Sequence, residues 1–387
     1  MTSGDSETAG PSTARQRRAA RLARVREAMA ANDVQALLLS HGADLPWLTG
    51  YRAMPLERLT LLVLPEHGEA TLLVPQLEAA RVPDPPEGVV LRPWAETEDP
   101  LDVAVALVGS DRDGRLALSA RAWAVTLLGL QRRLPQACFL DASEVTGPLR
   151  AVKDGSEIEA LRRAAAAADR VATTLQQGAV RLTGRSERDV SKEISERLIE
   201  EGHRRVNFAI VGSGPNGASP HHDAGARVIS TGDVVVCDFG GEWAGAGDEV
   251  AYCSDITRTV AVGQPSSEIR DCYAVLQAAQ AAAVAAARPG VAAEDVDNAA
   301  REIIADAGFG ERFIHRTGHG IGIEEHEDPY IVAGNRTALV EGHAFSVEPG
   351  LYFPDRFGMR LEDILVVTRD GSEALNRADH DLVVVEA

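Results

Sequence analysis

The segment HRTGHGIGIEEHEDPY, residues 315–330, concentrates side chains that could bind metal or move protons. It holds three histidines, four acidic residues and three glycines. His315 and His319 are four residues apart, which is the spacing of a histidine pair on a zinc-binding helix. However, glycines alternate through the segment, and each costs about 1 kcal/mol relative to alanine inside a helix. We therefore predict an extended segment, and any partner ligands of His319 must come from elsewhere in the chain.

Two stretches in the second half of the chain resemble one another, and each carries an acid in a mostly apolar run. In STGDVVVCDFG (230–240) and VEGHAFSVEPG (340–350), a glycine is followed six residues later by Asp238 or Glu348. Each stretch precedes a second acid in an apolar run, Asp255 in SDITRTVAV and Glu362 in MRLEDILVV. The repeat predicts two similar units with pseudo-twofold symmetry, whose acids face one another.

The negative charges of four carboxylates in apolar strands must be neutralised or paired. A buried carboxylate costs several kcal/mol unless it is paired or neutralised, and neighbouring ones repel each other. Two divalent cations would offset all four charges. With His319, the acids form a set of four oxygen ligands and one nitrogen ligand, which suits Mn(II), Co(II) or Zn(II). Metals that share a hydroxide in such a set form a hydrolytic centre.

Taken singly, these acids also have ordinary explanations. Asp255 could cap a turn with Ser254, and Glu362 could pair with Arg360. Three other acids of the region are predicted to be solvated surface residues; they are Glu327, Asp328 and Asp363.

The composition limits the classes of protein and partner. The 387 residues carry a net charge of -19, which argues against binding to nucleic acid or to an anionic membrane. The four cysteines form no C-x-x-C pair, which favours a reducing cytoplasm. The longest apolar run, AVLQAAQAAAVAAA, is mostly alanine and too weak for a membrane span.

The elements that must position these residues fall into two predicted domains. Residues 1–14 are predicted to be a disordered tail, and 15–153 an α/β domain with a central sheet. Its strands are predicted in VQALLLS, LTLLVLP, TLLVP, VAVALVG and RLALSA. A capping box at Ser156 and Glu159 predicts the first helix of a second domain, 154–387. Further helices are predicted from Ser186, over 266–288 and over 293–307.

The motifs TGHGIGIEEHEDP, FSVEPGLY and RLEDILVVT, after VVVCDFGG and SDITRT, resemble those of pita-bread metallopeptidases. The likeness is greatest to Xaa-Pro dipeptidases (prolidases) and aminopeptidase P. It covers 153–387, and the preceding domain looks like the creatinase-type N-terminal domain. The resemblance implies an α/β two-domain protein, with a creatinase-like α/β domain before a pita-bread α+β domain of pseudo-twofold symmetry.

The resemblance also implies a site with two divalent metal ions, with Mn(II) as the first choice and Co(II) or Zn(II) as alternatives. Asp238 would chelate the first ion, and Asp255 and Glu362 would bridge both. His319 and Glu348 would complete the second.

Further roles follow from the same resemblance. Glu348 would act as general base, and His326 would stabilise the tetrahedral intermediate. His221 would hold the scissile region of the substrate, and Arg360 would position the substrate or a bridging carboxylate. His315 would have a supporting role, while His222 remains an alternative to its neighbour, although the preceding Pro220 favours His221 as the match.

The implied reaction is hydrolysis of Xaa-Pro bonds by a metal-bridging hydroxide. The partners would be small peptides with proline in second position, and the protein would be a cytoplasmic homodimer. A dipeptidase is the first interpretation. The alternatives are aminopeptidase P, acting on longer peptides, and, from another class, a pita-bread protein that binds peptides without cleaving them.

The link between Asp238 and Asp255 is longer than this family usually shows. The additional residues centre on WAGAGDE, residues 243–249. Such an insertion fits the tip of a hairpin. Trp243 then has two possible places, against a substrate ring or partner subunit, or against its own sheet.

Overall fold

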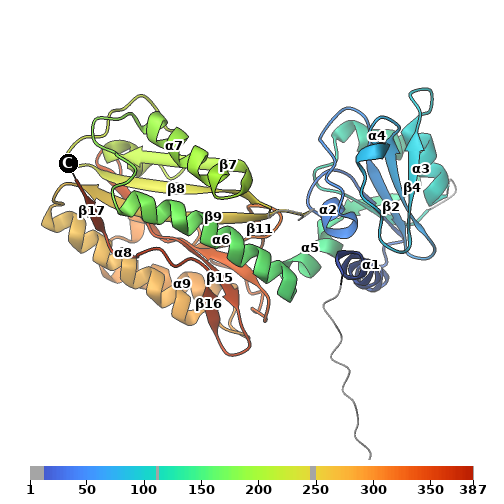
Figure 1. Ribbon diagram of the computed structural model, residues 1–387. Coiled ribbons are helices and arrows are strands. Elements are labelled where there is room, and N and C mark those ends of the chain that lie inside the picture. The colour runs from blue at the N-terminus through green and yellow to red at the C-terminus, as the bar shows by residue number, and fades with distance from the viewer. Residues whose placement is uncertain (1–12, 110–112, 245–249, 387) are drawn as a thin grey trace, which may run out of the picture. The chain divides into compact units, whose positions relative to one another are not determined.

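A computed structural model describes residues 13–109, 113–244 and 250–386 of the protein (Figure 1). The chain divides into two compact units, residues 1–149 and 150–387. The predicted tail falls mostly outside the described residues. Helix α1 begins at Ala14, with Thr13 as its N-cap.

In residues 13–109 and 113–149, the first unit is built on one six-stranded sheet, with strand order β4-β3-β2-β1-β5-β6. Its strands are β1 (Ala36–Leu39), β2 (Leu61–Pro65), β3 (Ala70–Pro75), β4 (Val89–Trp94), β5 (Arg115–Leu118) and β6 (Cys138–Asp141). Its helices are α1 (Ala14–Ala31), α2 (Asp44–Thr49), α3 (Pro100–Val108) and α4 (Ala124–Arg133), and α5 (Ser143–Ala151) crosses into the second unit. The predicted α/β architecture with a central sheet is confirmed.

One predicted strand of this unit is wrong, because VAVALVG lies in helix α3 and its following residue. Asp99 accepts a hydrogen bond from the backbone N–H of Leu101 as the N-cap, and Pro100 occupies the first turn. These helix-start signals lie just before the apolar run and outweigh its strand-like composition.

Among its described residues, the second unit contains four complete α-helices and two larger sheets. The first sheet contains β7 (His203–Ser213), β8 (Val234–Trp243), β9 (Tyr252–Val262) and β17 (Val383–Val385). The second contains β10 (Gly318–Gly320), β11 (Glu327–Ile331), β12 (Ala344–Val347), β15 (Asp363–Val367) and β16 (Ser372–Ala374). A hairpin of β13 (Gly350–Phe353) and β14 (Phe357–Arg360) lies between β12 and β15 in the chain.

Each sheet is covered by its own pair of helices, as Figure 1 shows. Helices α6 (Gly155–Gln176) and α7 (Glu187–Glu200) share a core with β7, β8 and β9. Helices α8 (Ser267–Ala286) and α9 (Ala293–Asp306) share another core with β12, β13 and β15. The two matched halves confirm the predicted pseudo-twofold arrangement.

The start of α6 differs from the predicted capping box. The N-cap is Asp154, whose carboxylate accepts hydrogen bonds from the backbone N–H groups of Ser156 and Glu157. Asp154 forms the reciprocal pair with Glu157, so the N-cap lies two residues before the predicted one. The predicted N-cap of α7 is confirmed, because Ser186 accepts from the backbone N–H of Asp189 at 3.2 Å.

Within the part of the chain that the structure describes, no helix has both the length and the apolarity required to span a bilayer.

Candidate metal centre

Strands β8 and β9 carry the first two acids on one face of their sheet. The strands pair antiparallel, with Asp238 opposite Thr257 and Asp255 opposite Gly240. Because residues two apart on a strand share a face, both carboxylates project to the same side. The sequence could predict the two strands, but their register decides that the acids lie diagonally across from each other.

The second half of the unit supplies the other ligand candidates. Glu348 directly follows β12, and Glu362 directly precedes β15, which is the partner of β12. His319 lies in the middle of the short strand β10. The predicted extended conformation around His319 is therefore confirmed.

The alternating glycines around His319 are required by close backbone contacts. A Cβ atom on Gly318 would lie 1.8 Å from the carbonyl oxygen of Ser346, and one on Gly320 would lie 2.2 Å from that of Asp328. Because these glycines have no side chains, β10 can lie close to both of its neighbouring strands, β11 and β12. In this position the imidazole of His319 reaches the acids.

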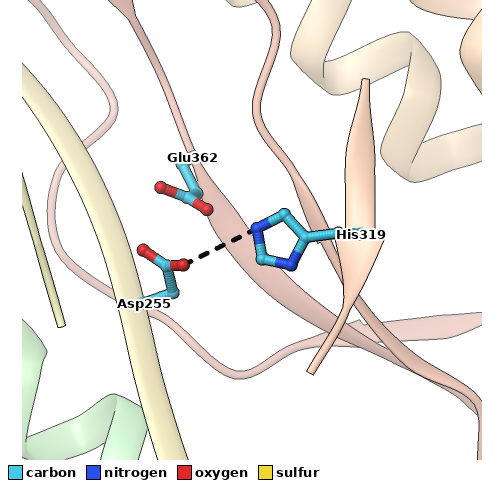
Figure 2. Close-up of side chains that lie close together, drawn as sticks. All are labelled: Asp255, His319 and Glu362. Atoms are coloured by element: carbon cyan, nitrogen blue, oxygen red, sulfur yellow. Dashed lines mark ion pairs between the residues drawn. The ribbon is translucent and has the colours of Figure 1, made fainter. Parts of the chain in front are cut away.

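The two halves bring the candidate ligands together. His319 Nε2 lies 3.3 Å from Glu348 Oε1 and 3.7 Å from Asp255 Oδ2. Asp255, His319 and Glu362 each offer a ligand atom within 4.8 Å of the others. Figure 2 shows these three side chains converging, Asp255 from β9, His319 from β10 and Glu362 from the residue before β15.

The electrostatics of this cluster are those of crowded acids. Burial raises the pKa of Asp255 and of Glu362 well above their ordinary values, and neighbouring carboxylates raise both further. Burial also raises the pKa of Asp238, although Arg360 opposes the shift. Glu348 behaves differently: burial acts to raise its pKa, but a hydrogen bond and the charge of His319 lower it to about 2.

The residues present fit divalent cations. Asp238 Oδ1 and Asp255 Oδ1 are buried and accept no hydrogen bond. A buried acceptor without a partner is costly, and a cation would satisfy both oxygens while relieving the repulsion between the acids. All of the donors are oxygen or imidazole nitrogen, which excludes a thiolate-type site.

Arg360 contacts the acids from behind. Its guanidinium is almost completely buried, pairs with Asp238, and donates to Tyr352 Oη at 2.8 Å and Thr257 Oγ1 at 3.1 Å. The Thr257 hydroxyl donates to Glu362 Oε2 at 2.7 Å. Arg360 therefore forms its ion pair with Asp238 and not with Glu362, to which it is linked by hydrogen bonds through Thr257.

His315 borders the same cavity as the carboxylates, but its two ring nitrogens contact the carbonyl oxygen of Arg316 and the hydroxyl of Tyr352. Its Nε2 atom is 2.8 Å from Tyr352 Oη, which in turn accepts a hydrogen bond from Arg360. Tyr352 thus links His315 to Arg360 through its hydroxyl group, a role that the sequence analysis did not predict. Tyr352 lies in β13, four residues after Glu348. The pairing of β13 with β14 places its hydroxyl beside Arg360.

The cluster opens into a cavity of about 760 Å³. His221, His326, Arg316 and Phe208 are among the residues that line it. The imidazoles of His319 and His326 lie 4.0 Å apart between ring centroids. Partial burial, the nearby His319 and the nearby Arg316 lower the pKa of His326.

The adjacent histidines of the PHHD motif point to different surroundings. His221 lines the cavity. His222 is not among the cavity residues, and its Nε2 atom is 2.8 Å from the buried carboxylate of Glu187. The structure thus brings His221, rather than His222, to the metal-ligand candidates.

Two of the three acids predicted to be solvated are buried. The side chain of Glu327 is 8% exposed and accepts a hydrogen bond from Lys153 Nζ at 2.6 Å. Asp363 is fully buried and pairs with the guanidinium of Arg258 at 2.8 Å. Both predictions were wrong because the cationic partners come from distant parts of the chain. Asp328 is exposed, as predicted.

Trp243 packs against its own unit. Its indole N–H donates to the carbonyl oxygen of Glu201 at 3.2 Å, and the ring contacts Gly202. The rest of the predicted insertion, residues 245–249, lies outside the described residues.

Fold and site together define a metal-dependent hydrolase, in which two similar halves each contribute acids to one centre. Residues 159–369 match the model of metallopeptidase family M24, and residues 21–152 match that of the creatinase/prolidase N-terminal domain. The chain therefore belongs to metallopeptidase family M24 and is a peptidase that uses divalent metal ions. The expected pita-bread and creatinase-type domains are confirmed.

Relatives extend over nearly the whole chain. The probable dipeptidase PepE of Mycobacterium tuberculosis is 45% identical over 95% of this chain and 96% of its own. An Xaa-Pro dipeptidase of Lactobacillus helveticus is 35% identical over 90% of this chain and 94% of its own. The crystal structure of dipeptidase PepE from Mycobacterium ulcerans has a TM-score of 0.90 and 43% identity, over 97% of this chain and 100% of that one.

Proposed function

We propose that the protein is an Xaa-Pro dipeptidase that uses two divalent metal ions. The observation that carries this proposal is the convergence of four carboxylates and one imidazole on one open cavity. The relatives named as dipeptidases and Xaa-Pro dipeptidases support the substrate class.

The proposed ligands follow from the arrangement of the two sheets. Asp238 would hold one ion, and Asp255 and Glu362 would be ligands shared by both ions. His319 and Glu348, which lie 3.3 Å apart, complete the other ion. When bound, such ions polarise a carbonyl oxygen and lower the pKa of a water molecule.

The side chains around the ions have distinct proposed roles. The neighbouring His319 lowers the pKa of Glu348 and keeps its carboxylate ionised at neutral pH, so that Glu348 can accept a proton and pass it to the leaving nitrogen. His326 has a lowered pKa and is neutral at pH 7, so that it can donate a hydrogen bond to the carbonyl oxygen as negative charge develops. His221 borders the same cavity and holds the scissile region, and Arg360 keeps Asp238 in place.

Arg316 supports a dipeptide as the substrate. Arg360 is buried and paired with Asp238, whereas Arg316 lines the cavity and lies 4.5 Å from the ring of Tyr330. Within residues 13–109, 113–244 and 250–386, no carboxylate forms an ion pair with Arg316. A guanidinium in this position can bind the free terminal carboxylate of a dipeptide.

The remaining proposals concern the metal, the location and the assembly. A set of oxygen ligands with one imidazole favours Mn(II), with Co(II) and Zn(II) as alternatives. Four free thiols, including the exposed Cys138, support a cytoplasmic location. Residues 154–387 would carry catalysis, and 15–153 would be an accessory domain. Exposed apolar side chains on α4, including Val125 and Leu128, support a homodimer, which sedimentation analysis can test.

The decisive experiment compares Ala-Pro with Ala-Pro-Ala as substrates of the protein loaded with Mn(II). A dipeptidase hydrolyses the first much faster than the second. Faster cleavage of the tripeptide would instead identify an aminopeptidase P. Metal binding without cleavage of either peptide would support a peptide-binding protein.

A further inference from the structure

Glu187, in the first turn of α7, is a completely buried carboxylate outside the metal cluster. Its Oε1 atom accepts hydrogen bonds from the backbone N–H of Ser213 at 2.8 Å and from the hydroxyl of Ser213 at 2.7 Å. Its Oε2 atom lies 2.8 Å from Nε2 of His222 and 3.4 Å from the backbone nitrogen of Gly225. The amide of Asn216 donates to both oxygens, at 3.1 and 3.0 Å.

These partners all belong to one segment, residues 213–225, which we call the His221 loop. It begins with the last residue of strand β7, includes a short 3-10 helix (Gly214–Ala218), and then contributes four residues to the cavity wall. These are Ser219, Pro220, His221 and Asp223. Glu187 thus contacts the loop at its start, its middle and its end, on both sides of His221.

The surroundings of Glu187 make this contact rigid. The backbone N–H groups of Glu187 and Arg188 donate to the carbonyl oxygens of Arg227 and Gly225, so the chain just after the loop covers the N-terminus of α7. At the far side, Gly217 lies directly against Gly358 of β14, where a Cβ on Gly358 would come within 1.8 Å of the Gly217 oxygen. The carbonyl oxygen of Pro220 is 3.4 Å from a guanidinium nitrogen of Arg360.

We infer that Glu187 is a positioning residue, which sets the place of His221 and Pro220 in the substrate cavity through its hydrogen bonds to the His221 loop. It touches neither the substrate cavity nor the metal-ligand candidates. Its effect on catalysis must therefore pass through the loop. The inference rests on the proposed function, because it takes His221 to be a substrate contact.

The test uses the full-length protein loaded with Mn(II) and the variant Glu187→Gln, which keeps the size of the side chain. Glutamine retains an oxygen for Ser213 but places an NH₂ group against the donors of Asn216 and Gly225. We expect kcat/KM for Ala-Pro to fall about tenfold or more, because small displacements of a substrate-positioning group have large effects on rate. The bound metal per chain should stay as in the wild type.

The matched control is Asp169→Asn. Asp169 is also a buried carboxylate on a helix of this unit, and it accepts two backbone hydrogen bonds, from Arg377 and Ala378. That segment does not line the cavity, so this variant should keep kcat/KM within about twofold of the wild type. A milder variant, Asn216→Ala, removes the amide that donates to Glu187 and should lower kcat/KM by a smaller factor. This variant tests the inference even if Glu187→Gln does not fold.

A double-mutant comparison separates positioning from general destabilisation. In a His221→Ala background, Glu187→Gln should lower kcat/KM by less than about threefold, because the group that it positions has been removed. An equal loss in both backgrounds, or a loss of bound metal with Glu187→Gln, would overturn the inference.

A readout without substrate keeps the inference separate from the proposed function. Trypsin can cleave after Arg227, just beyond the loop, and Glu187→Gln should accelerate this cleavage several-fold while Asp169→Asn does not. If the wild type fails to hydrolyse Ala-Pro, the proposed function is wrong, and the trypsin comparison still decides whether Glu187 holds the loop. If trypsin cleaves Glu187→Gln after Arg227 no faster than it cleaves the wild type, the inference is overturned, whatever the peptidase activity.

Discussion

Replacing Asp255 with asparagine should have opposite effects on the metal-free and metal-loaded protein. Without metal, Asp255 and Glu362 are buried carboxylates that offer ligand atoms within 4.8 Å of each other. Two full charges at this distance repel by about 3.5 kcal/mol at an effective dielectric constant of about 20. A raised pKa lessens the negative charge that each group carries, so we expect Asp255→Asn to recover only part of this repulsion, about 1–3 kcal/mol of stability at pH 7.

The pH dependence follows from the direction of the shifts. The pKa values of Asp255 and Glu362 in the folded protein lie above their ordinary values of 3.8 and 4.5. The metal-free protein therefore loses stability as the pH rises from these ordinary values through the raised ones. Asp255→Asn removes one of the two titrating groups that cause this loss of stability. The metal-free variant should therefore exceed the wild type in free energy of unfolding by more at pH 7 than at pH 5.

Thermal unfolding after chelation measures the effect. For a unit of this size, 1 kcal/mol corresponds to about 2–4 °C in Tm, so the metal-free variant should melt about 2–12 °C above the metal-free wild type. Added Mn(II) should raise the Tm of the wild type and have little effect on the variant, which lacks a bridging ligand. Asp271→Asn, at an exposed position of α8, changes the net charge equally and controls for it. A metal-free Asp255→Asn protein that melts below the wild type would refute the proposed repulsion.

Three further predictions concern the metal, the histidines and the substrate. Chelation should abolish peptidase activity and Mn(II) or Co(II) should restore it, as a continuous Ala-Pro assay can measure; full activity with no metal detected would contradict a metal-dependent reaction. His319→Ala should lose bound metal, whereas His315→Ala should keep its metal and lose alignment of the site or stability. Elemental analysis measures the metal bound by each variant, and equal loss in both would contradict the assignment of His319 alone as the histidine ligand. Arg316→Ala should raise KM for Ala-Pro about tenfold or more but leave cleavage of Ala-Pro amide almost unchanged, and a similar rise for both would argue against carboxylate binding by Arg316.

Local sequence was sufficient where a residue's neighbours in the chain set its conformation. The glycines around His319 exclude a helix, and that segment is a strand. The repeated pattern around Asp238 and Glu348 predicted two matched halves, and each half has its own sheet and helix pair. The predicted helix starts succeeded at Ser186 and failed at Ser156, where the neighbouring Asp154 is the N-cap. In such cases the deciding hydrogen bonds span only a few residues.

Contacts between distant segments depend on strand register and packing, and only the tertiary structure decided them. Asp363 follows a ligand candidate directly and has the composition of a surface acid, yet Arg258, more than a hundred residues earlier, pairs with it in the core. Glu187 has the pattern of an ordinary acid in a first helical turn, yet it holds the His221 loop and takes His222 away from the cavity. The amino-acid sequence by itself thus determined which residue types are available for metal and peptide chemistry. The fold determined which of them meet, because a carboxylate buried among apolar strands must find its partner wherever the packing places one.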